Sequence, residues 1–191
     1  MEKTILIIDG GYLRKISKKL HKKYTPEYIE KCAQKITEEE NLLRILYYDC
    51  LPYEGEVILP ISKNKKKFES VDWMEELGKK EFFAIRKGKL KFRGYTLKKE
   101  SQGKANLTDD DFEPNFEQKG VDMRIGLDIA SYSHNGIVDK IIIVTNDTDC
   151  VPALKDARRN GISISLAELN SVNLSYELLL HVDKQIKIEL P

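Results

Sequence analysis

The chain contains 191 residues, of which 41% are hydrophobic and 33% are charged. This length favours a single domain whose core can form without disulfides or structural metals, and the composition excludes a fully disordered chain and a membrane protein. With 32 basic and 31 acidic residues, the net charge of +1 also excludes a uniformly basic nucleic-acid-binding protein.

The near-neutral total hides a segregation of charge along the chain. Residues 63–104 hold 14 basic and 6 acidic side chains, whereas residues 105–191 hold 8 basic and 15 acidic ones. An asymmetry of this kind indicates an anionic partner or a charged site.

Neither the cysteines nor the first residues indicate export. The three cysteines lack CxxC spacing, which is typical of reduced thiols rather than a disulfide framework. The first apolar run, Ile5–Ile8, is too short for a signal-peptide core or a membrane span. The sequence therefore predicts a soluble, cytoplasmic protein that does not contact a membrane.

The first 50 residues alternate between apolar runs and amphipathic stretches. Lys3–Ile8 is a β-branched apolar run followed by Asp9-Gly10-Gly11, which is typical of a buried strand. The next predicted elements are a helix in which Leu13, Ile16 and Leu20 share a face, a helix from Pro26 to about Ile36, and a strand at Leu43–Cys50.

The middle of the chain is less regular, and we expect residues 53–118 to form a basic, insertion-like segment. Its predicted parts are a loop at Tyr53–Pro60, a helix at Lys65–Gly78, two strands at Phe82–Arg86 and Lys89–Phe92 joined by a tight turn at Lys87-Gly88, and a long mobile connection from Gly94 to Gln118. No linker divides the chain, so residues 1–191 are predicted to form one domain.

The C-terminal part returns to alternating helices and strands. The predicted elements are a helix at Val121–Tyr132, a buried strand at Lys140–Thr145, a helix at Pro152–Arg159, a strand at Ile162–Leu166 and a helix at about Ser171–His181. Apolar strands that alternate with helices predict an α/β fold with a mainly parallel sheet covered on both faces.

Carboxylates follow two of the predicted strands. Asp9 comes directly after the first strand, and Asp147 and Asp149 follow Lys140–Thr145. Because ligands bind outside the carboxyl ends of parallel strands, these side chains are candidates for a functional site. A helix cap is the alternative role for Asp149, which precedes Pro152.

The helix predicted at Val121–Tyr132 contributes two further acids. Asp122 lies in the first turn at the edge of the apolar face, where the helix dipole alone would favour it. Asp128 lies within the apolar stripe, where a carboxylate is costly unless it is paired or binds a cation.

Clustered carboxylates favour a divalent cation, because their repulsion would otherwise keep some of them protonated. Oxygen ligands without nearby His or Cys are typical of Mg²⁺ or Mn²⁺, and these ions also bind phosphate oxygens. The pattern therefore predicts phosphodiester or phosphoryl-transfer chemistry. The candidate metal ligands are Asp9, Asp122, Asp147 and Asp149, with Asp128 as a fifth candidate.

Three stretches of the sequence are similar to a known family. IDGGYL (Ile8–Leu13), KGVDMRIGLDIA (Lys119–Ala130) and IVTNDTDCVP (Ile143–Pro152) resemble, in order and spacing, the NYN domain of the LabA-like (DUF88) group of PIN-like nucleases. The resemblance implies a PIN-like three-layer α/β/α sandwich and metal-dependent ribonuclease activity. It places the family's four catalytic, metal-binding acids at Asp9, Asp122, Asp147 and Asp149, and its second helix acid at Asp128.

The sequence departs from the family pattern near these acids. Tyr12 stands where the family usually has Asn, and Asn146, Thr148 and Cys150 replace a Gly, a Ser and a Phe in the last block. All four acids remain, so the departures concern the positioning of substrate. The predicted substrate-binding residues around the acids are Tyr12, Asn146, Thr148 and Lys119.

Lys65, Lys66 and Lys67 form a second predicted contact for RNA within the basic middle of the chain. Lysines close to aromatic residues such as Phe92 and Tyr95 suit a single strand, whose phosphates pair with cations and whose bases stack. A solvated, lysine-rich surface is the alternative interpretation.

The sequence thus predicts a Mg²⁺- or Mn²⁺-dependent endoribonuclease that acts on single-stranded RNA, with a homodimer as a way to complete an exposed substrate groove. The alternative is a catalytically weak RNA-binding or protein-interaction module that retains the fold and the acids. A phosphatase with the pattern DxDx[TV] is disfavoured, because Gly11 stands where that pattern needs its second acid.

Overall fold

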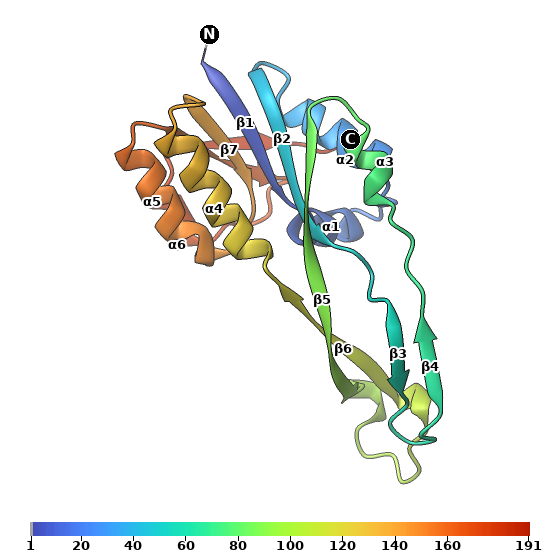
Figure 1. Ribbon diagram of the computed structural model, residues 1–191. Coiled ribbons are helices and arrows are strands. Elements are labelled where there is room, and N and C mark those ends of the chain that lie inside the picture. Colours follow the sequence, from blue (N-terminus) through green and yellow to red (C-terminus); the bar gives the residue numbers. More distant parts are fainter. Residues whose placement is uncertain (1) are drawn as a thin grey trace. The chain divides into compact units, whose positions relative to one another are not determined.

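The computed structural model describes residues 2–191 (Figure 1). The chain forms two compact units. The first contains the chain up to Asp49, Trp73–Lys87 and Val121–Pro191, and the second contains Cys50–Asp72 and Gly88–Gly120. Residues 73–87, which were expected within the insertion-like segment, therefore belong to the first unit.

A mostly parallel sheet of seven strands has the order β6-β5-β2-β1-β7-β8-β9 within residues 2–191. β1 is parallel to both β2 and β7, and β8 is parallel to both β7 and β9, whereas β5 and β6 are antiparallel. The strands are β1 (Lys3–Asp9), β2 (Asn41–Cys50), β5 (Phe83–Leu97), β6 (Phe112–Lys119), β7 (Lys140–Val144), β8 (Ser163–Leu169) and β9 (Lys184–Ile188). The predicted α/β class with a mainly parallel sheet is confirmed.

The helices of the first unit connect these parallel strands. They are α1 (Gly10–Lys19), α2 (Pro26–Ile36), α3 (Met74–Gly78), α4 (Val121–His134), α5 (Val151–Arg159) and α6 (Tyr176–Leu179). α4 and α5 pack against each other, as Figure 1 shows in yellow and orange, while α1 contacts β1 and α5 contacts β8. Within residues 2–191, none of the helices has the length and apolar character needed to cross a bilayer.

Strand β1 is the centre of the first unit's core. Ile5–Ile8 are fully buried, as expected for a continuous apolar run with a neighbouring strand on each side. Ile8 is in register with Tyr47 of β2 and with Val144 of β7, so the carboxyl ends of the three strands meet at one edge of the sheet. Asp9 and the residues that follow Val144 are therefore brought to the same edge.

The prediction of a helix at Lys65–Gly78 is wrong for most of these residues. Lys65–Phe68 forms β4, which is antiparallel to β3 (Gly55–Ile58), and only Met74–Gly78 is helical. β3 also lies within the predicted loop at Tyr53–Pro60. Hydrogen bonding between the two short strands overrides the local helical pattern, as tertiary pairing often does.

The tight turn predicted at Lys87-Gly88 is also wrong, because β5 runs without a break from Phe83 to Leu97. The irregularity lies instead near Gly94, where the pairing with β6 shifts register between Phe92 and Tyr95 and Gly94 has a φ of 98°. The connection expected from Gly94 to Gln118 accordingly contains the end of β5, two 3₁₀ turns and most of β6.

The predicted final helix at Ser171–His181 is reduced to the single turn of α6, and β9 was not predicted. Asn170 and Ser171 both have positive φ angles, 47° and 54°, which are incompatible with a helix and begin a loop instead. β9 is short and carries two lysines, a composition that suits the edge of a sheet.

The core of the second unit is a cluster of aromatic rings. Tyr53 lies 5.2 Å from Phe116, and Phe92 lies 5.2 Å from Tyr95, measured between ring centroids. Phe68 packs edge-on against Phe116 at 5.7 Å. Because these rings pack on one another, Phe92 and Tyr95 have a structural role in holding the strands of this unit together.

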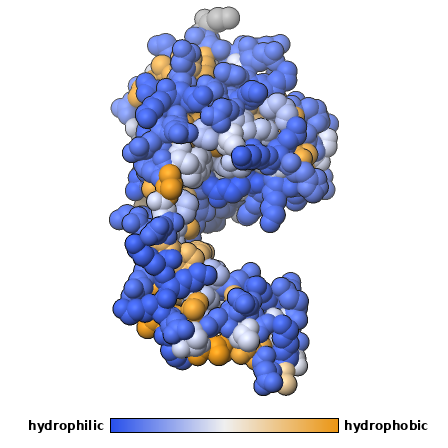
Figure 2. Space-filling view, turned by 90° about the vertical axis from the view of Figure 1, so that its right-hand side faces the viewer, coloured by the Kyte–Doolittle hydropathy of each residue, from blue (hydrophilic) through white to orange (hydrophobic). Residues whose placement is uncertain are grey.

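The visible surface of each unit is mostly hydrophilic (Figure 2). This distribution agrees with a chain in which one third of the residues are charged and the long apolar side chains of β1, β2 and β7 are buried.

We expect Gly10→Ala to lower the free energy of unfolding by about 1–3 kcal/mol, because a methyl group there overpacks a buried site. A Cβ at position 10 would contact the Tyr47 hydroxyl and would lie 2.7 Å from Asp49 Oδ2. The matched control is Gly126→Ala, whose Cβ would lie 3.8 Å from Ala153 Cβ and should raise helix stability by up to about 1 kcal/mol. Chemical denaturation measures both, and equal stability of the two variants would contradict the packing argument.

Candidate functional site

An open pocket of about 1100 Å³ lies at the carboxyl edge of β1 and β7. Asp9 and the segment Asn146–Thr148 line it between two walls. One wall is a face of α1, and the other is the loop Ser171–Asn173 after β8. The pocket thus brings together five of the predicted site residues, Asp9, Tyr12, Asn146, Asp147 and Thr148.

Asp9 is held in place by the start of α1 and by the end of β7. Its Oδ1 accepts a hydrogen bond from the Tyr12 backbone N–H at 3.1 Å, so it caps the helix. Its Oδ2 accepts a bond from the Thr145 hydroxyl at 3.2 Å. Burial raises the pKa of the Asp9 carboxyl, and the charge of Asp49 raises it further, while these hydrogen bonds oppose the shift.

Thr145 links the two strand-end acids. Besides donating to Asp9, its Oγ1 accepts a hydrogen bond from the Asp147 backbone N–H at 3.1 Å. Asp147 Oδ1 in turn accepts a bond from the backbone N–H of Asp149 at 2.9 Å, so Asp147 caps the turn Thr148–Cys150. The alternative role of Asp149 as a helix cap is therefore wrong, since α5 begins without a side-chain cap.

Asp122 lies in the first turn of α4, within electrostatic reach of the other three acids. Burial raises the pKa of its carboxyl, and the negative charges of Asp147, Asp9 and Asp149 raise it further, in that order. Asp122 and Asp149 do not line the pocket itself. The four predicted acids are nevertheless close enough to repel one another.

Asp128 has partners that explain its place in the apolar stripe of α4. Its Oδ2 accepts hydrogen bonds from Arg86 Nε and from the Tyr48 hydroxyl, both at 2.7 Å. The Arg86–Asp128 ion pair joins α4 to β5, and Tyr48 adds β2. A carboxylate in an apolar stripe was expected either to be paired or to bind a cation, and the structure shows that Asp128 is paired.

A buried network beneath Asp9 was not predicted from the sequence. Asp49, at the end of β2, is 1% exposed and forms an ion pair with Arg14. The Tyr47 hydroxyl donates to Asp49 Oδ2 at 2.9 Å, and Tyr24 contacts Tyr47 at 2.7 Å and donates to the Gly10 carbonyl at 3.1 Å. The network fixes the backbone that carries Asp9, and its only sequence signal was an acid at the end of a second apolar strand.

Two predicted substrate-binding residues of the pocket, Asn146 and Tyr12, differ in their hydrogen bonding. The Asn146 side-chain carbonyl accepts a hydrogen bond from the Ser175 backbone N–H at 2.7 Å, so it anchors the loop that forms one wall. The Tyr12 side chain is 9% exposed, and its hydroxyl has no hydrogen-bond partner within residues 2–191. An unsatisfied buried hydroxyl costs about 1–3 kcal/mol.

The predicted basic residues lie elsewhere, in the second unit. Lys65 and Lys67 form ion pairs with Glu56 and Glu69, at 2.8 and 2.9 Å. The Lys66 ammonium lies 5.3 Å from the centre of the Phe68 ring. Lys119 pairs with Glu117.

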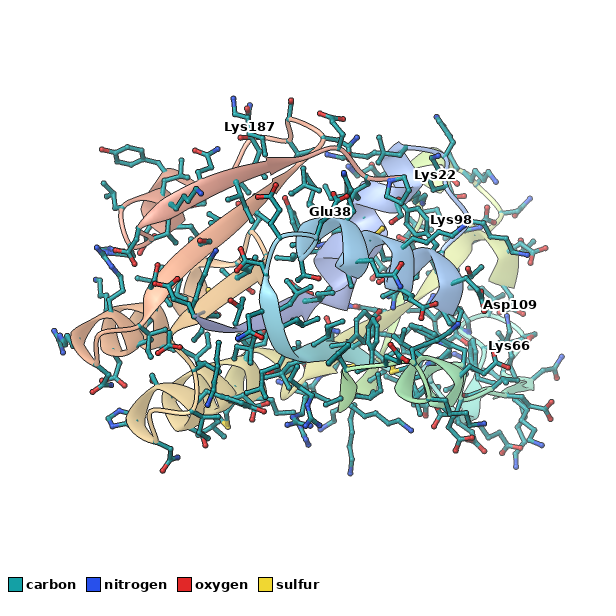
Figure 3. The ribbon with its side chains drawn as sticks, turned by 90° about the horizontal axis from the view of Figure 1, so that it is seen from above. Lys22, Glu38, Lys66, Lys98, Asp109 and Lys187 are labelled. Atoms are coloured by element: carbon teal, nitrogen blue, oxygen red, sulfur yellow. The ribbon has the colours of Figure 1, made fainter. Side chains whose placement is uncertain are left out.

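Acidic residues thus offset the lysines of this unit, which carries 11 basic and 10 acidic side chains in total. Lys66, Lys98 and Asp109, which are labelled in Figure 3, all belong to this unit. The strong positive charge expected for the middle of the chain does not persist in the folded unit.

Three lysines of α1 were not predicted to belong to the site. Lys15, Lys18 and Lys19 line the same pocket as Asp9 and Asp147. In sequence they are the solvent-facing side of an amphipathic helix, and no local pattern distinguishes them from other surface lysines.

The pocket suits a hard divalent cation, because the carboxylates of Asp9 and Asp147 and other oxygen-bearing side chains line it and no His or Cys does. The raised pKa values of Asp9 and Asp122 also indicate acids that a cation would stabilise. In residues 2–191, however, no three acidic, histidine or cysteine side chains already form a metal-binding group. The residues therefore fit Mg²⁺ or Mn²⁺ by chemistry and charge, without a preformed coordination shell.

Comparison with known families matches residues 3–189 to the NYN domain. The chain belongs to the NYN domain family. NYN domains are part of the PIN-like nuclease superfamily, which indicates a nuclease and agrees with the mostly parallel sheet described above.

A solved structure supports the fold of this NYN domain. The crystal structure of VPA0982, a protein of unknown function from Vibrio parahaemolyticus, is 13% identical in sequence and has a TM-score of 0.55. The similarity covers 97% of this chain and 92% of that one. A comparison with curated proteins gives no match.

We expect Asp122→Asn to raise the melting temperature at neutral pH in EDTA. The pKa of Asp122 is raised in the folded state, so its ionised form opposes folding once the pH exceeds its unfolded pKa. Glu27→Gln is the matched control in the first turn of α2, and it should lower the melting temperature. The Glu27 carboxylate accepts hydrogen bonds from its own backbone N–H and from the Thr25 hydroxyl, which lower the pKa of Glu27, so its ionised form favours folding. Shifts in the same direction for both variants would contradict this assignment.

Tyr12→Phe should leave the free energy of unfolding unchanged or raise it by up to about 1–3 kcal/mol, since it removes a hydroxyl that lacks a partner. Tyr48→Phe should instead destabilise the fold, because its hydroxyl donates to Asp128. Urea denaturation compares the two. A marked destabilisation by Tyr12→Phe would show that its hydroxyl is satisfied in solution.

Proposed function

We propose that this NYN domain is a Mg²⁺- or Mn²⁺-dependent endoribonuclease whose metal is held by Asp9, Asp122, Asp147 and Asp149. The observation that carries the proposal is the convergence of Asp9 and Asp147, linked through the Thr145 hydroxyl, in one pocket at the edge of the sheet. Asp122 lies close enough that, beyond the effect of burial, the charges of the other three acids raise its pKa. Four carboxylates that repel one another gain stability from a bound divalent cation.

A divalent cation at these acids would activate a water molecule and stabilise the negative charge that develops on a phosphodiester. The protein's own contribution is to fix the acids. Hydrogen bonds from the Tyr12 backbone N–H and from the Thr145 hydroxyl orient the Asp9 carboxylate. The same Thr145 hydroxyl accepts a hydrogen bond from the Asp147 backbone N–H and so positions that residue.

Hydrolysis by this route joins the water oxygen to phosphorus and breaks the bond between phosphorus and the 3′ oxygen. The 3′ oxygen takes up a proton, and the products carry a 5′-phosphate and a 3′-hydroxyl. We place Thr148 among the substrate contacts, because it lines the pocket between Asp147 and Asp149 and carries a hydroxyl.

Asp128 is left out of the proposed ligand set, since Arg86 and Tyr48 already bind the same carboxylate oxygen. We further propose membership of the LabA-like (DUF88) group, which the blocks IDGGYL, KGVDMRIGLDIA and IVTNDTDCVP support. A three-layer α/β/α arrangement is supported by the packing of α1 on β1 and of α5 on β8.

An alternative function is an RNA-binding module with weak or no catalysis. It is favoured by the lack of a preformed metal-binding group within the part of the chain that the structure describes. Binding of RNA without cleavage, in the presence of metal, would identify this function.

The test is cleavage of single-stranded and structured RNAs with Mn²⁺, Mg²⁺ or EDTA. We expect EDTA, Asp9→Asn and Asp147→Asn each to reduce the rate by at least about 100-fold, equivalent to about 2.7 kcal/mol in activation free energy. Asp156→Asn is the control, because Asp156 pairs with His134 on the surface of α5 and does not line the pocket. Cleavage that survives EDTA, or that the two site variants retain in full, would refute the proposed metal site.

A further inference from the structure

The wall of the pocket formed by α1 is positively charged. Lys15, Lys18 and Lys19 all line the pocket and are exposed. Within residues 2–191, no carboxylate forms an ion pair with any of them, although Asp9 and Asp147 line the same pocket. Their ammonium groups are therefore free to bind an anion that enters from outside.

The spacing of these lysines follows from the helix. Lys15 and Lys19 are one turn apart, about 6 Å along the axis, and share a face with Tyr12 and Ile16. A separation of this order is comparable with that of neighbouring phosphates along an extended single strand. The row lies on the helix that Asp9 caps, and Lys15 follows Asp9 by six residues, about 9 Å along the axis.

Favourable interaction with the helix dipole explains two of the three lysines on α1 but not the third. Lys18 and Lys19 lie in the last turn of α1, where the helix dipole favours positive side chains. Lys15 lies outside that turn and gains little from the dipole, yet it points to the same pocket. The feature that all three lysines share is that they line the pocket, so their positions are better explained by the pocket than by the helix dipole.

The opposite wall is anchored at both ends by side-chain hydrogen bonds. Asn146 accepts a hydrogen bond from the Ser175 backbone N–H, which ties one end of the loop to the strand-end acids. At the other end, the Asn170 side chain accepts from the Leu190 backbone N–H at 3.1 Å and donates to Glu189 at 2.8 Å. The groove between this loop and α1 therefore exists before any ligand binds.

The lining also includes apolar surface. Val172 in the loop supplies most of it, because Tyr12 and Ile16 of α1 line the pocket but are only 9% and 2% exposed. A ligand would therefore meet lysines and an apolar side chain together. This combination suits a single strand, whose phosphates contact cations while its bases contact apolar or aromatic side chains. A duplex keeps its bases stacked inside and cannot use such a lining.

We propose that the groove between α1 and the loop at 171–173 binds single-stranded RNA, with Lys15 and Lys19 contacting consecutive phosphates beside the bond to be cleaved. The inference rests on the proposed nuclease function and assigns the phosphate contacts to α1. Lys65 and Lys67 do not line this groove, and they form exposed ion pairs with Glu56 and Glu69 in the second unit.

The test measures binding in EDTA, so a failure of cleavage does not affect it. Fluorescence anisotropy of a labelled oligouridylate gives Kd over a series of KCl concentrations. Lys15→Gln combined with Lys19→Gln should weaken binding about 10-fold at low salt. The double substitution should also reduce the slope of log Kd against log [KCl] by about 1.4, or about 0.7 for each phosphate that a lysine no longer neutralises.

Lys35→Gln combined with Lys80→Gln is the matched control, since it removes the same charge from lysines that form ion pairs with Glu38 and Glu30 and that lie outside every predicted RNA contact. We expect its slope to match that of the unmodified protein, and we expect a duplex RNA to bind more weakly than the single strand. An unchanged slope in the α1 variant, an equal loss in the control, equal binding of the duplex, or no binding by the unmodified protein would each overturn the proposal.

Discussion

The burial of β1 between two parallel neighbours is the constraint on which the candidate site depends. Ile5–Ile8 have no exposed surface, so the strand cannot shift by one residue without moving apolar side chains out of the core. Its register with β2 and β7 therefore fixes where Asp9 leaves the sheet. The same register places Asp49 beneath Gly10 and Thr145 beside Asp9, which explains why one edge of the sheet concentrates so much negative charge.

That concentration opposes folding in the absence of a counter-charge, and the surrounding structure compensates for it. Arg14 and Tyr47 bind Asp49, and hydrogen bonds from the backbone of α1 and from Thr145 partly offset the burial of Asp9. Asp122 and Asp149, which are exposed, have less compensation of this kind. The site thus combines acids that are fixed by hydrogen bonds, the half-buried Asp9 and the buried Asp49, with exposed acids whose negative charge is not balanced by such contacts.

Local patterns were enough to predict most of the first unit and its acids. β1 and β7 are continuous apolar runs, and an acid at the end of such a run is visible in sequence, as with Asp9 and Asp147. Patterns failed where pairing between distant segments decides the structure. Lys65–Phe68 is a strand because β3 pairs with it, and Asp128 is neutralised by Arg86, 42 residues earlier. The lysines of α1 were overlooked because their significance comes from the loop after β8, which is distant in sequence.

The anchoring of that loop by Asn146 and Asn170 has a thermodynamic consequence. Because the segment between them is ordered in the folded chain, its conformational entropy is lost during folding and need not be lost again when a ligand enters. Asn146 replaces a glycine of the family pattern and Asn170 adopts a left-handed backbone, so the order is maintained by two side chains that bond to distant backbone groups. Ligand binding to a groove prepared in this way should produce little new protection of the loop amides from hydrogen exchange, since the ordering that would protect them is already present.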